Sequence, residues 1–352
     1  MESGGLMSAP SHVPESAEQS DAVDVAVTAP VGRSDAGNRS LRQIAWQRLR
    51  KDKVAMVSGI VVVLLILAAI LAPLLVKWFG YPPTQFNQDL IEPNTGLPMR
   101  DPDNPDPFDT DPWGAISGDH LLGVEPKTGR DLFSRILYGA QISLLVAFLS
   151  TLLCVALGTV LGIIAGYKGG WVDTLISRAM DVFLAFPLML FAIALVGVIP
   201  DGVLGLHGNG LRVGVIVFII GFFNWPYIAR IVRGQTLSLR EREFVEAARS
   251  LGASNRHILF REILPNLVTP IVVYSTLLIP TNILFEAALS FLGVGINPPT
   301  PSWGKMLSDA VPLAQSAPYY ILFPGLAIFI TVLAFNLFGD GLRDAFDPKT
   351  SD

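Results

Sequence analysis

The residue types that carry enzyme chemistry are few in this chain and are not grouped into sets. Its four histidines, His12, His120, His207 and His257, are not spaced so that they could share a metal ion, and Cys154 is the only cysteine. No serine–histidine pairing or His/Asp/Glu cluster indicates a nucleophile or a general base. The sequence therefore predicts no catalytic residue, no metal site and no cofactor bound by this chain.

Nucleotide chemistry has equally little support. The sequence contains no phosphate-binding run of the G-x-x-x-x-G-K-[ST] type. The nearest run, Gly304-Lys305-Met306, lacks both the upstream glycine and the hydroxyl residue. We therefore expect any nucleotide hydrolysis linked to this protein to occur on another polypeptide, and nothing in the sequence predicts nucleic-acid binding.

Polar side chains inside long apolar runs are the remaining candidates for direct chemistry, because such side chains are costly in lipid. Asn282 and Glu286 lie one helical turn apart near the end of one run, and Asn224 lies in another. One hypothesis is that all three line a pathway through the membrane, where Glu286 would meet a cationic group of a solute. The alternative is that Glu286 lies at the interface and bonds to neighbouring helices.

The elements that must position these residues are membrane-spanning helices. The chain is 51% hydrophobic and only 16% charged, with a mean hydropathy of +0.49, which is too apolar for an ordinary soluble domain. We predict an all-α integral membrane protein with six transmembrane helices, some needing help from flanking aromatic residues. The candidate spans are residues 54–76, 141–166, 182–199, 213–229, 267–285 and 319–338.

Charge predicts the topology. Residues 41–53 form a basic juxtamembrane segment, which the positive-inside rule assigns to the cytoplasm. Six spans then return the C-terminal tail, 342–352, to the same side, and residues 77–140 become an extracellular insertion between the first two spans. Residues 1–40, rich in Ser, Ala, Gly, Pro and Asp, predict a disordered cytoplasmic tail. The bases before the first span are Arg42, Arg48, Arg50, Lys51 and Lys53.

Two patterns around the second span predict how it packs. Apolar and polar residues alternate at helical spacing over 130–137, which predicts either an interfacial helix on the outer surface or a helix packed within the extracellular lobe. Small residues then recur at four-residue spacing inside the span and predict a face for close helix packing within a permease core, 141–341. The small residues are Ser150, Cys154, Gly158, Gly162 and Gly166.

A charged segment lies between the fourth and fifth spans. Residues 230–265 contain seven arginines and four glutamates. Ser238 and Glu241 have the spacing of a capping box, Gly252 could end that helix in a left-handed cap, and Ser254 could begin a second helix that runs to Pro265. This segment could be a solvated loop with basic anchors for anionic lipid. Two capped helices with an apolar face favour a partner surface instead; that face is Phe244, Val245, Ala248 and Leu251.

The same segment carries a family resemblance. Glu246-Ala247-Ala248, followed after three residues by Gly252 and ending in Leu264-Pro265, resembles the EAA loop of ABC importer permeases. Longer segments are similar to the dipeptide/oligopeptide/nickel branch and, within it, to the C-type permease subunit. They are "HLLGVEPKTGRDLFSRILYGAQISL", "GYKGGWVDTLISRAMDVFLAFP" and "EAALSFLGVGINPPTPSWGKML".

The resemblance covers roughly residues 40–345 and departs from the usual pattern in two places. The family tends to have Thr-Asp where this chain has Val124 and Glu125, and a hydrophobic residue where it has Glu262.

The resemblance implies the type I ABC importer permease fold and a coupling loop, 233–265, that seats in a cytoplasmic ATPase. The coupling residues carried over are Glu246, Ala247, Ala248, Gly252 and Ala253. It also implies a second, homologous permease in a heterodimer, two ATPase subunits that bind ATP and Mg, and an extracellular solute-binding protein. The expected location is the bacterial cytoplasmic membrane, and the expected solutes are peptides or, alternatively, another solute such as nickel.

Three other classes of protein remain to be weighed. A secondary transporter should show an internal repeat and ionisable residues deep in several spans, whereas this sequence has no clear repeat and only Glu286 as a candidate. A membrane enzyme would need a catalytic constellation. A structural scaffold fits the composition, yet it would not need the EAA-like segment.

Overall fold

The computed structural model describes residues 41–101, 109–198, 202–203 and 206–346. The tail expected over residues 1–40 lies outside the described residues, as does the end of the C-terminal tail. The predicted C-terminal boundary at residue 342 is too early, because the last helix continues to Phe346.

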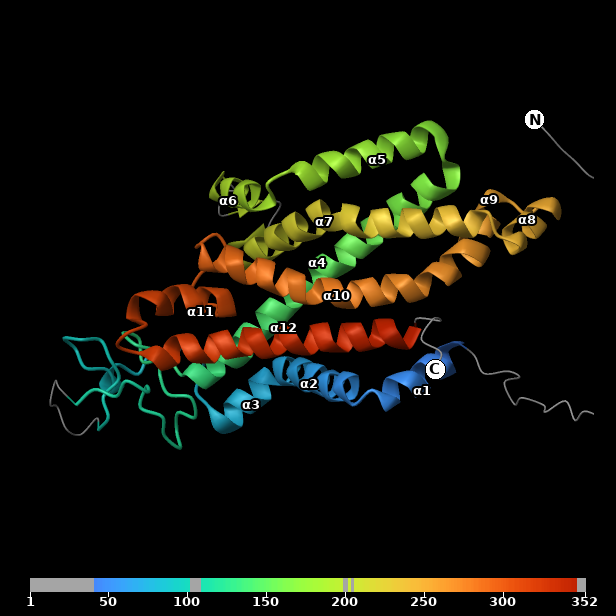
Figure 1. Ribbon diagram of the computed structural model, residues 1–352. Helices are drawn as coiled ribbons and strands as arrows, with labels where there is room; N and C mark the ends of the chain where they lie inside the picture. The colour runs from blue at the N-terminus through green and yellow to red at the C-terminus, as the bar shows by residue number, and fades with distance from the viewer. Residues whose placement is uncertain (1–40, 102–108, 199–201, 204–205, 347–352) are drawn as a thin grey trace, which may run out of the picture. The chain divides into compact units, whose positions relative to one another are not determined.

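Helices make up most of this structure (Figure 1). Short 3-10 turns cover Gln88–Leu90 and Val311–Leu313, a π-helical turn, η2, covers Ile258–Ile263, and β1 (Gly202–Val203) pairs antiparallel with β2 (Leu206–His207). The helices are α1 (Leu41–Lys51), α2 (Lys53–Ile70), α3 (Ala72–Phe79), α4 (Leu132–Lys168), α5 (Gly170–Ala185), α6 (Leu188–Val198), α7 (Gly208–Arg240), α8 (Glu243–Ser250), α9 (Asn255–His257), α10 (Leu264–Phe291), α11 (Trp303–Ala310) and α12 (Pro318–Phe346).

Within the described residues, five helical segments are long and apolar enough to cross a membrane, and α5 with α6 makes a sixth if the pair is counted as one broken span. The predicted all-α membrane architecture is therefore confirmed. A straight span over 182–199 is wrong, because α5 and α6 meet at an angle of 79°. Phe186 is extended there, with ψ of 128°. Its neighbour Pro187 lacks an N–H and disfavours helical backbone at the preceding residue, which accounts for the break.

The first predicted span is also divided. Instead of one helix over 54–76, α2 ends at Ile70 and α3 begins at Ala72, with Leu71 between them at ψ of 4°. Pro73 in the first turn of α3 has no N–H to continue the hydrogen-bond pattern of α2. Upstream of both, the basic segment 41–53 is itself helical over α1.

The segment 130–137 is not an interfacial helix. Residues from Leu132 onward form the first turns of α4, a single 37-residue helix that is long and apolar enough to cross a membrane. Its polar side faces inward, because Asp131, Ser134 and Arg135 are all buried. The segment is packed within the lobe that precedes α4, as the alternative expected; whether that lobe is extracellular stays a prediction.

Helix α4 is the central element, since it contacts α2, α5, α7, α10 and α12. In Figure 1, α5, α7, α10, α12 and α2 follow one another across the view while α4 crosses behind them. Glycines bring α4 and α7 together: a Cβ on Gly158, Gly162 or Gly166 would lie 2.7–2.8 Å from a backbone oxygen of α7. Such contacts are possible only for residues without a side chain, which explains the four-residue spacing.

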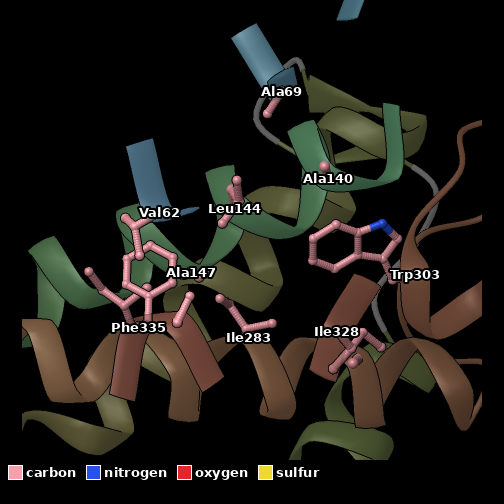
Figure 2. Close-up of a cluster of buried hydrophobic side chains, with 12 residues drawn as sticks. Val62, Ala69, Ala140, Leu144, Ala147, Ile283, Trp303, Ile328 and Phe335 are labelled. Carbon is pink, nitrogen blue, oxygen red and sulfur yellow. The ribbon is translucent and has the colours of Figure 1, made fainter. Parts of the chain in front are cut away.

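The largest apolar cluster joins helices that are distant in sequence (Figure 2). Val62 and Ala69 of α2 meet Leu144 and Ala147 of α4, and Ile283 of α10 lies between them and α12. Trp303 at the start of α11 fills the outer end of the cluster and donates a hydrogen bond from its indole to the Ile136 carbonyl at 3.0 Å. Bulky apolar side chains thus bind the N-terminal span to the remaining helices. The other members are Ala140, Ile279, Ala287, Ile328, Ala334 and Phe335.

A buried carboxylate fixes the loop before α4. Glu125 forms ion pairs with Arg130 at 2.6 Å and Arg135 at 2.7 Å, and the Tyr320 hydroxyl donates to it at 2.8 Å. Arg135 also donates to the Pro299 carbonyl at 3.4 Å. This network joins the lobe, α4, α12 and the loop that precedes α11.

Candidate functional site

The candidate site is the segment between α7 and α10, and its first helix begins later than predicted. Ser238 does not cap a helix, because α7 continues through it to Arg240. Thr236 is buried and Leu239 packs on an apolar cluster with α4, so burial keeps this stretch helical after it leaves the membrane. Helix α8 starts instead at Glu243, with extended backbone at Arg242 as its N-cap. Glu243 and Glu246 in its first turn favour the positive end of the helix dipole.

The predicted left-handed cap at Gly252 is present. Gly252 has φ of +79°, and its N–H donates to the Arg249 carbonyl at 3.0 Å. The Ala253 N–H donates to the Ala248 carbonyl at 3.0 Å, which completes a Schellman motif. A Cβ on Gly252 would meet nothing within 4 Å, so the backbone conformation, and not space, requires glycine.

The second helix begins where the sequence predicts. The Ser254 hydroxyl accepts the His257 N–H at 3.3 Å as an N-cap. Helix α9, the π-helical turn and α10 then follow without a break, so that residues 255–291 form one continuous helical segment. Pro265 follows the π-helical turn inside this continuous segment, where its missing N–H leaves one position of the helical hydrogen-bond pattern unfilled.

The apolar face predicted for α8 is divided between two surfaces. Val245 is fully buried and Ala248 packs beside it, in a cluster with Ile258 and Ile263 of the second helix. The same cluster includes residues of α4 and α7, so it fastens the segment to the membrane helices. Phe244 and Leu251 point outward instead, and Leu251 is 88% exposed.

The outward surface combines the signature residues with apolar side chains. Glu246, Ala247 and Gly252 are exposed, whereas Ala248 and Ala253 are partly buried against the cluster. Phe260, which the sequence analysis did not single out, is 66% exposed on the second helix. The sequence held a signal for this exposure: Ile258, Leu259 and Phe260 are consecutive, so they cannot all face the same side of a helix. Large exposed apolar side chains ringed by charges are typical of a protein interaction surface.

Two hydrogen bonds join this segment to the C-terminal end of α4, the end that the sequence predicts to face the cytoplasm. The Tyr167 hydroxyl donates to the side-chain oxygen of Asn255 at 2.8 Å. Arg240, at the end of α7, donates to the Gly166 carbonyl at 3.0 Å. The segment is therefore held against α4 and α7 as well as being continuous with α10.

The three polar residues within the spans occupy two kinds of place. Glu286 is fully buried and accepts hydrogen bonds from Ser143 and Ser290, each at 2.7 Å. Asn282 is 1% exposed and donates to the Thr151 hydroxyl at 2.8 Å. Both lie between α10 and α4 and bond to neighbouring helices. Asn224 on α7 is partly exposed. Ser143 and Thr151 were not singled out from the sequence, although Ser143 lies two helical turns before the small-residue stripe on the same helix and Thr151 directly follows its first member, Ser150.

Comparisons with known proteins cover nearly all of this chain. Residues 158–352 match the family described as binding-protein-dependent transport system inner membrane component, and residues 40–96 match the N-terminal TM domain of oligopeptide transport permease C.

Relatives of known name and a solved structure also match. The dipeptide transport system permease protein DppC of Alkalihalophilus pseudofirmus is 43% identical over 87% of this chain and 89% of its own length. The glutathione transport system permease protein GsiD of Escherichia coli is 44% identical over 86% of this chain and 89% of its own. A chain of the MetNI methionine ABC transporter in an inward facing conformation aligns with 61% of this chain and 97% of its own, with a TM-score of 0.49 and 18% identity.

The family matches agree with the predicted multi-pass architecture. Two relatives above 40% identity each cover more than 85% of this chain. The chain therefore belongs to the family of binding-protein-dependent transport system inner membrane components, as a permease with the N-terminal transmembrane domain of the C type.

Proposed function

We propose that this protein is one permease subunit of an ATP-driven importer of dipeptides or oligopeptides, and that it forms half of the translocation pathway. The names of its relatives support peptides as the solute class. The observation that carries the coupling role is the outward surface of α8: Glu246, Ala247, Leu251 and Gly252 are exposed on a helix whose buried side is fastened to α4 and α7.

The mechanism follows from what this chain has and what it lacks. Its sequence contains no phosphate-binding motif, so two ATPase subunits, with their own ATP and Mg, supply the energy. Their closure displaces α8 and switches the pathway between inward-open and outward-open forms. A second homologous permease completes the pathway as a heterodimer, and an extracellular solute-binding protein delivers the peptide.

The same assignment orients the chain in the membrane. In Figure 1, α8, α1 and the end of α12 lie at one end of the helices, and the loops before α4 lie at the opposite end. Arginines and lysines gather at the first of these ends, which the positive-inside rule assigns to the cytoplasm. We therefore place both termini in the cytoplasm of a bacterial cell and the lobe of residues 80–131 outside.

Among the polar residues within the spans, Asn224 fits a pathway role best, because it is partly exposed while Asn282 and Glu286 bond α10 to α4. Uptake kinetics of Asn224→Ala and Glu286→Gln separate the roles. We expect Asn224→Ala to weaken the apparent affinity for peptide. For Glu286→Gln we expect an unchanged affinity and a lower yield of folded protein. If only Glu286→Gln changes the apparent affinity for peptide, Glu286 and not Asn224 would be assigned to the pathway.

A purification from mild detergent tests the coupling role. The tagged protein should recover a second permease and ATPase subunits, and Gly252→Pro should lose the ATPases because proline cannot adopt a positive φ and has no N–H for the Arg249 carbonyl. Glu246→Ala should weaken ATP-dependent uptake while leaving the protein inserted.

The chain offers a matched control at the other end of α10. Gly293 has φ of +80° and donates to the Ser290 carbonyl in the same motif. Gly293→Pro should retain the ATPases. Retention in both proline variants, or uptake that needs no ATP, would contradict the proposed function and favour a secondary transporter.

A further inference from the structure

A groove on the outside of the helix bundle has a composition that the transport role does not require. It lies between α2 and α12 and has a volume of about 430 Å³, within the range of about 300–1,000 Å³ that is usual for small-molecule sites. Its walls are apolar side chains, and Ser58 at its base is buried with its hydroxyl bonded to the Val54 carbonyl at 2.8 Å. The remaining lining residues are Val57, Val61, Ile330, Leu333, Ala334, Leu337 and, at one end, Lys53.

The shape of the groove follows from where α2 and α12 touch. A Cβ on Gly341 of α12 would lie 2.2 Å from the Ala55 side chain, and one on Gly59 would lie 3.0 Å from Phe338. The two helices are therefore in close contact along one line, while Val57 and Leu333 beside it remain 62% and 43% exposed. These exposed walls face the surroundings of the bundle.

One end of the groove is cationic. Lys53 lines it, and residues 48–53 contain four bases and one acid. The acid, Asp52, is engaged: its carboxylate accepts the N–H groups of Val54 and Ala55 at 2.9 and 3.1 Å as the N-cap of α2. In the part of the chain that the structure describes, neither Lys51 nor Lys53 forms a salt bridge.

Helix α1 holds this cationic end at the membrane surface. Ala45 and Leu49 of α1 are buried against Ala345 near the end of α12. On the opposite side, Trp46 is 54% exposed and the Arg50 guanidinium lies 5.7 Å from the centre of its ring. Exposed tryptophan beside basic residues is typical of the interface between lipid headgroups and hydrocarbon.

We propose that this groove binds one acyl chain of an anionic phospholipid, whose phosphate lies against Lys53 and the neighbouring bases of α1. An apolar wall alone would not select a lipid, because any bulk lipid chain is equally apolar. The positive charge at the end of the groove supplies the selection, since it favours an anionic headgroup over a zwitterionic one. The orientation proposed above serves only to name the leaflet, which is the cytoplasmic one.

The test is lipid retention by the whole complex. The complex is reconstituted in nanodiscs of equal parts phosphatidylglycerol and phosphatidylethanolamine, re-extracted, and its bound lipid identified by mass spectrometry. We expect phosphatidylglycerol to be enriched over the bulk ratio, and Lys53→Gln to lower that enrichment about fivefold. Val57→Trp should abolish it by filling the groove without a change of charge.

Matched controls use the same helices. Lys77→Gln removes an exposed base at the far end of α3, and Ile60→Trp adds the same bulk to an exposed position of α2 outside the groove. Both should retain the lipid. Bulk lipid composition in the wild type, or equal losses in variant and control, would overturn the proposal.

A photoreactive residue in place of Val57 distinguishes a bound lipid from a helix of another protein subunit as the occupant of the groove. Adducts with phosphatidylglycerol would support the proposal, whereas adducts with another protein subunit would overturn it by showing that a partner helix covers the groove. Neither result depends on the solute or on ATP, so failure here is distinguishable from failure of the proposed function.

Discussion

At the scale of single residues, the lobe before α4 depends on carboxylates whose surroundings the sequence did not reveal. Glu125 is a departure from the family pattern, and its side chain is completely buried between Arg130 and Arg135. The ionisable residues between 125 and 135 lie at the start of an apolar helix, and this placement was a usable signal. Their amphipathic spacing suggested a water-facing side, however, because periodicity cannot distinguish a polar side that meets solvent from one that meets a buried carboxylate.

Glu125→Gln should destabilise the protein by about 3 kcal/mol, because the neutral amide leaves two largely buried guanidinium groups without a counter-charge. Thermal unfolding in detergent measures the effect. Asp119→Asn, at an exposed position of the same lobe, is the control and should be close to neutral. Equal melting temperatures for the two variants would contradict the structural role assigned to the network.

A second carboxylate makes the lobe sensitive to acid. Hydrogen bonds from Thr95 and Asn94 lower the pKa of Glu92 from 4.5 to about 2. Because the folded-state pKa is depressed, this stabilisation is fully present above pH 4.5 and is lost as the pH falls towards 2. The protection factors of the amides of residues 94–97, which are the intrinsic exchange rates at each pH divided by the observed rates, should therefore fall over that range. Glu92→Gln should show low protection at every pH, and a wild-type profile in that variant would refute the assignment.

At the scale of elements, short-range signals predicted helix ends well where local chemistry decides them. Gly252 and Ser254 were both placed correctly, because a left-handed cap and an N-cap are set by one residue and its nearest amides. Ser238 has the same local code, yet it lies inside α7, because burial of Thr236 against α4 outweighs the preference of serine for a cap. Pro187 could be read from the sequence as a point where a helix bends, but the 79° angle between α5 and α6 could not.

The α4–α7 contact provides the prediction at this scale. Gly162→Val should destabilise the protein by about 2 kcal/mol, because its Cβ would lie 2.7 Å from the Ala229 carbonyl oxygen. Gly214→Val on α7 is the matched control, since a Cβ there meets nothing within 4 Å. Size-exclusion chromatography after heating measures the fraction of each variant that remains folded, and these fractions are compared. A more stable Gly162→Val variant would show that α4 and α7 are not held by this contact.

At the scale of the whole molecule, the sequence established the membrane class, the number of apolar segments and the position of the EAA segment. It could not establish which face of α8 points outward, because Val245 and Leu251 are both apolar and only the tertiary contacts separate them. For the same reason Glu286 and Asn282 could be assigned to a pathway or to a helix contact. Their partners, Ser143 and Thr151, lie more than 130 residues away.

The exposed apolar surface of α8 predicts how the complex assembles. Leu251→Asp should weaken ATPase binding about 30-fold, the effect of losing roughly 2 kcal/mol at a central contact, without unfolding a residue that is already 88% exposed. Leu121→Asp, exposed on the lobe at the opposite end, should leave this affinity unchanged. Titration of the solubilised permease with the ATPase subunits gives both values, and equal affinities would contradict the docking surface.

The unbroken course of residues 255–291 gives the assembly a lever. Thirty-seven helical residues without a loop form a rod of about 55 Å, with Ser254 at one end and Glu286 near the other. The segment has no hinge loop, but Pro270 and Pro280 lie inside it and are points where a helix bends. A tilt imposed beside α8 would therefore reach the α4 contact at Ser143 partly as bending at these prolines and partly as torque along the helix. The π-helical turn near the α8 end, where the hydrogen bonds span one more residue, is the place where that torque would wind or unwind the helix.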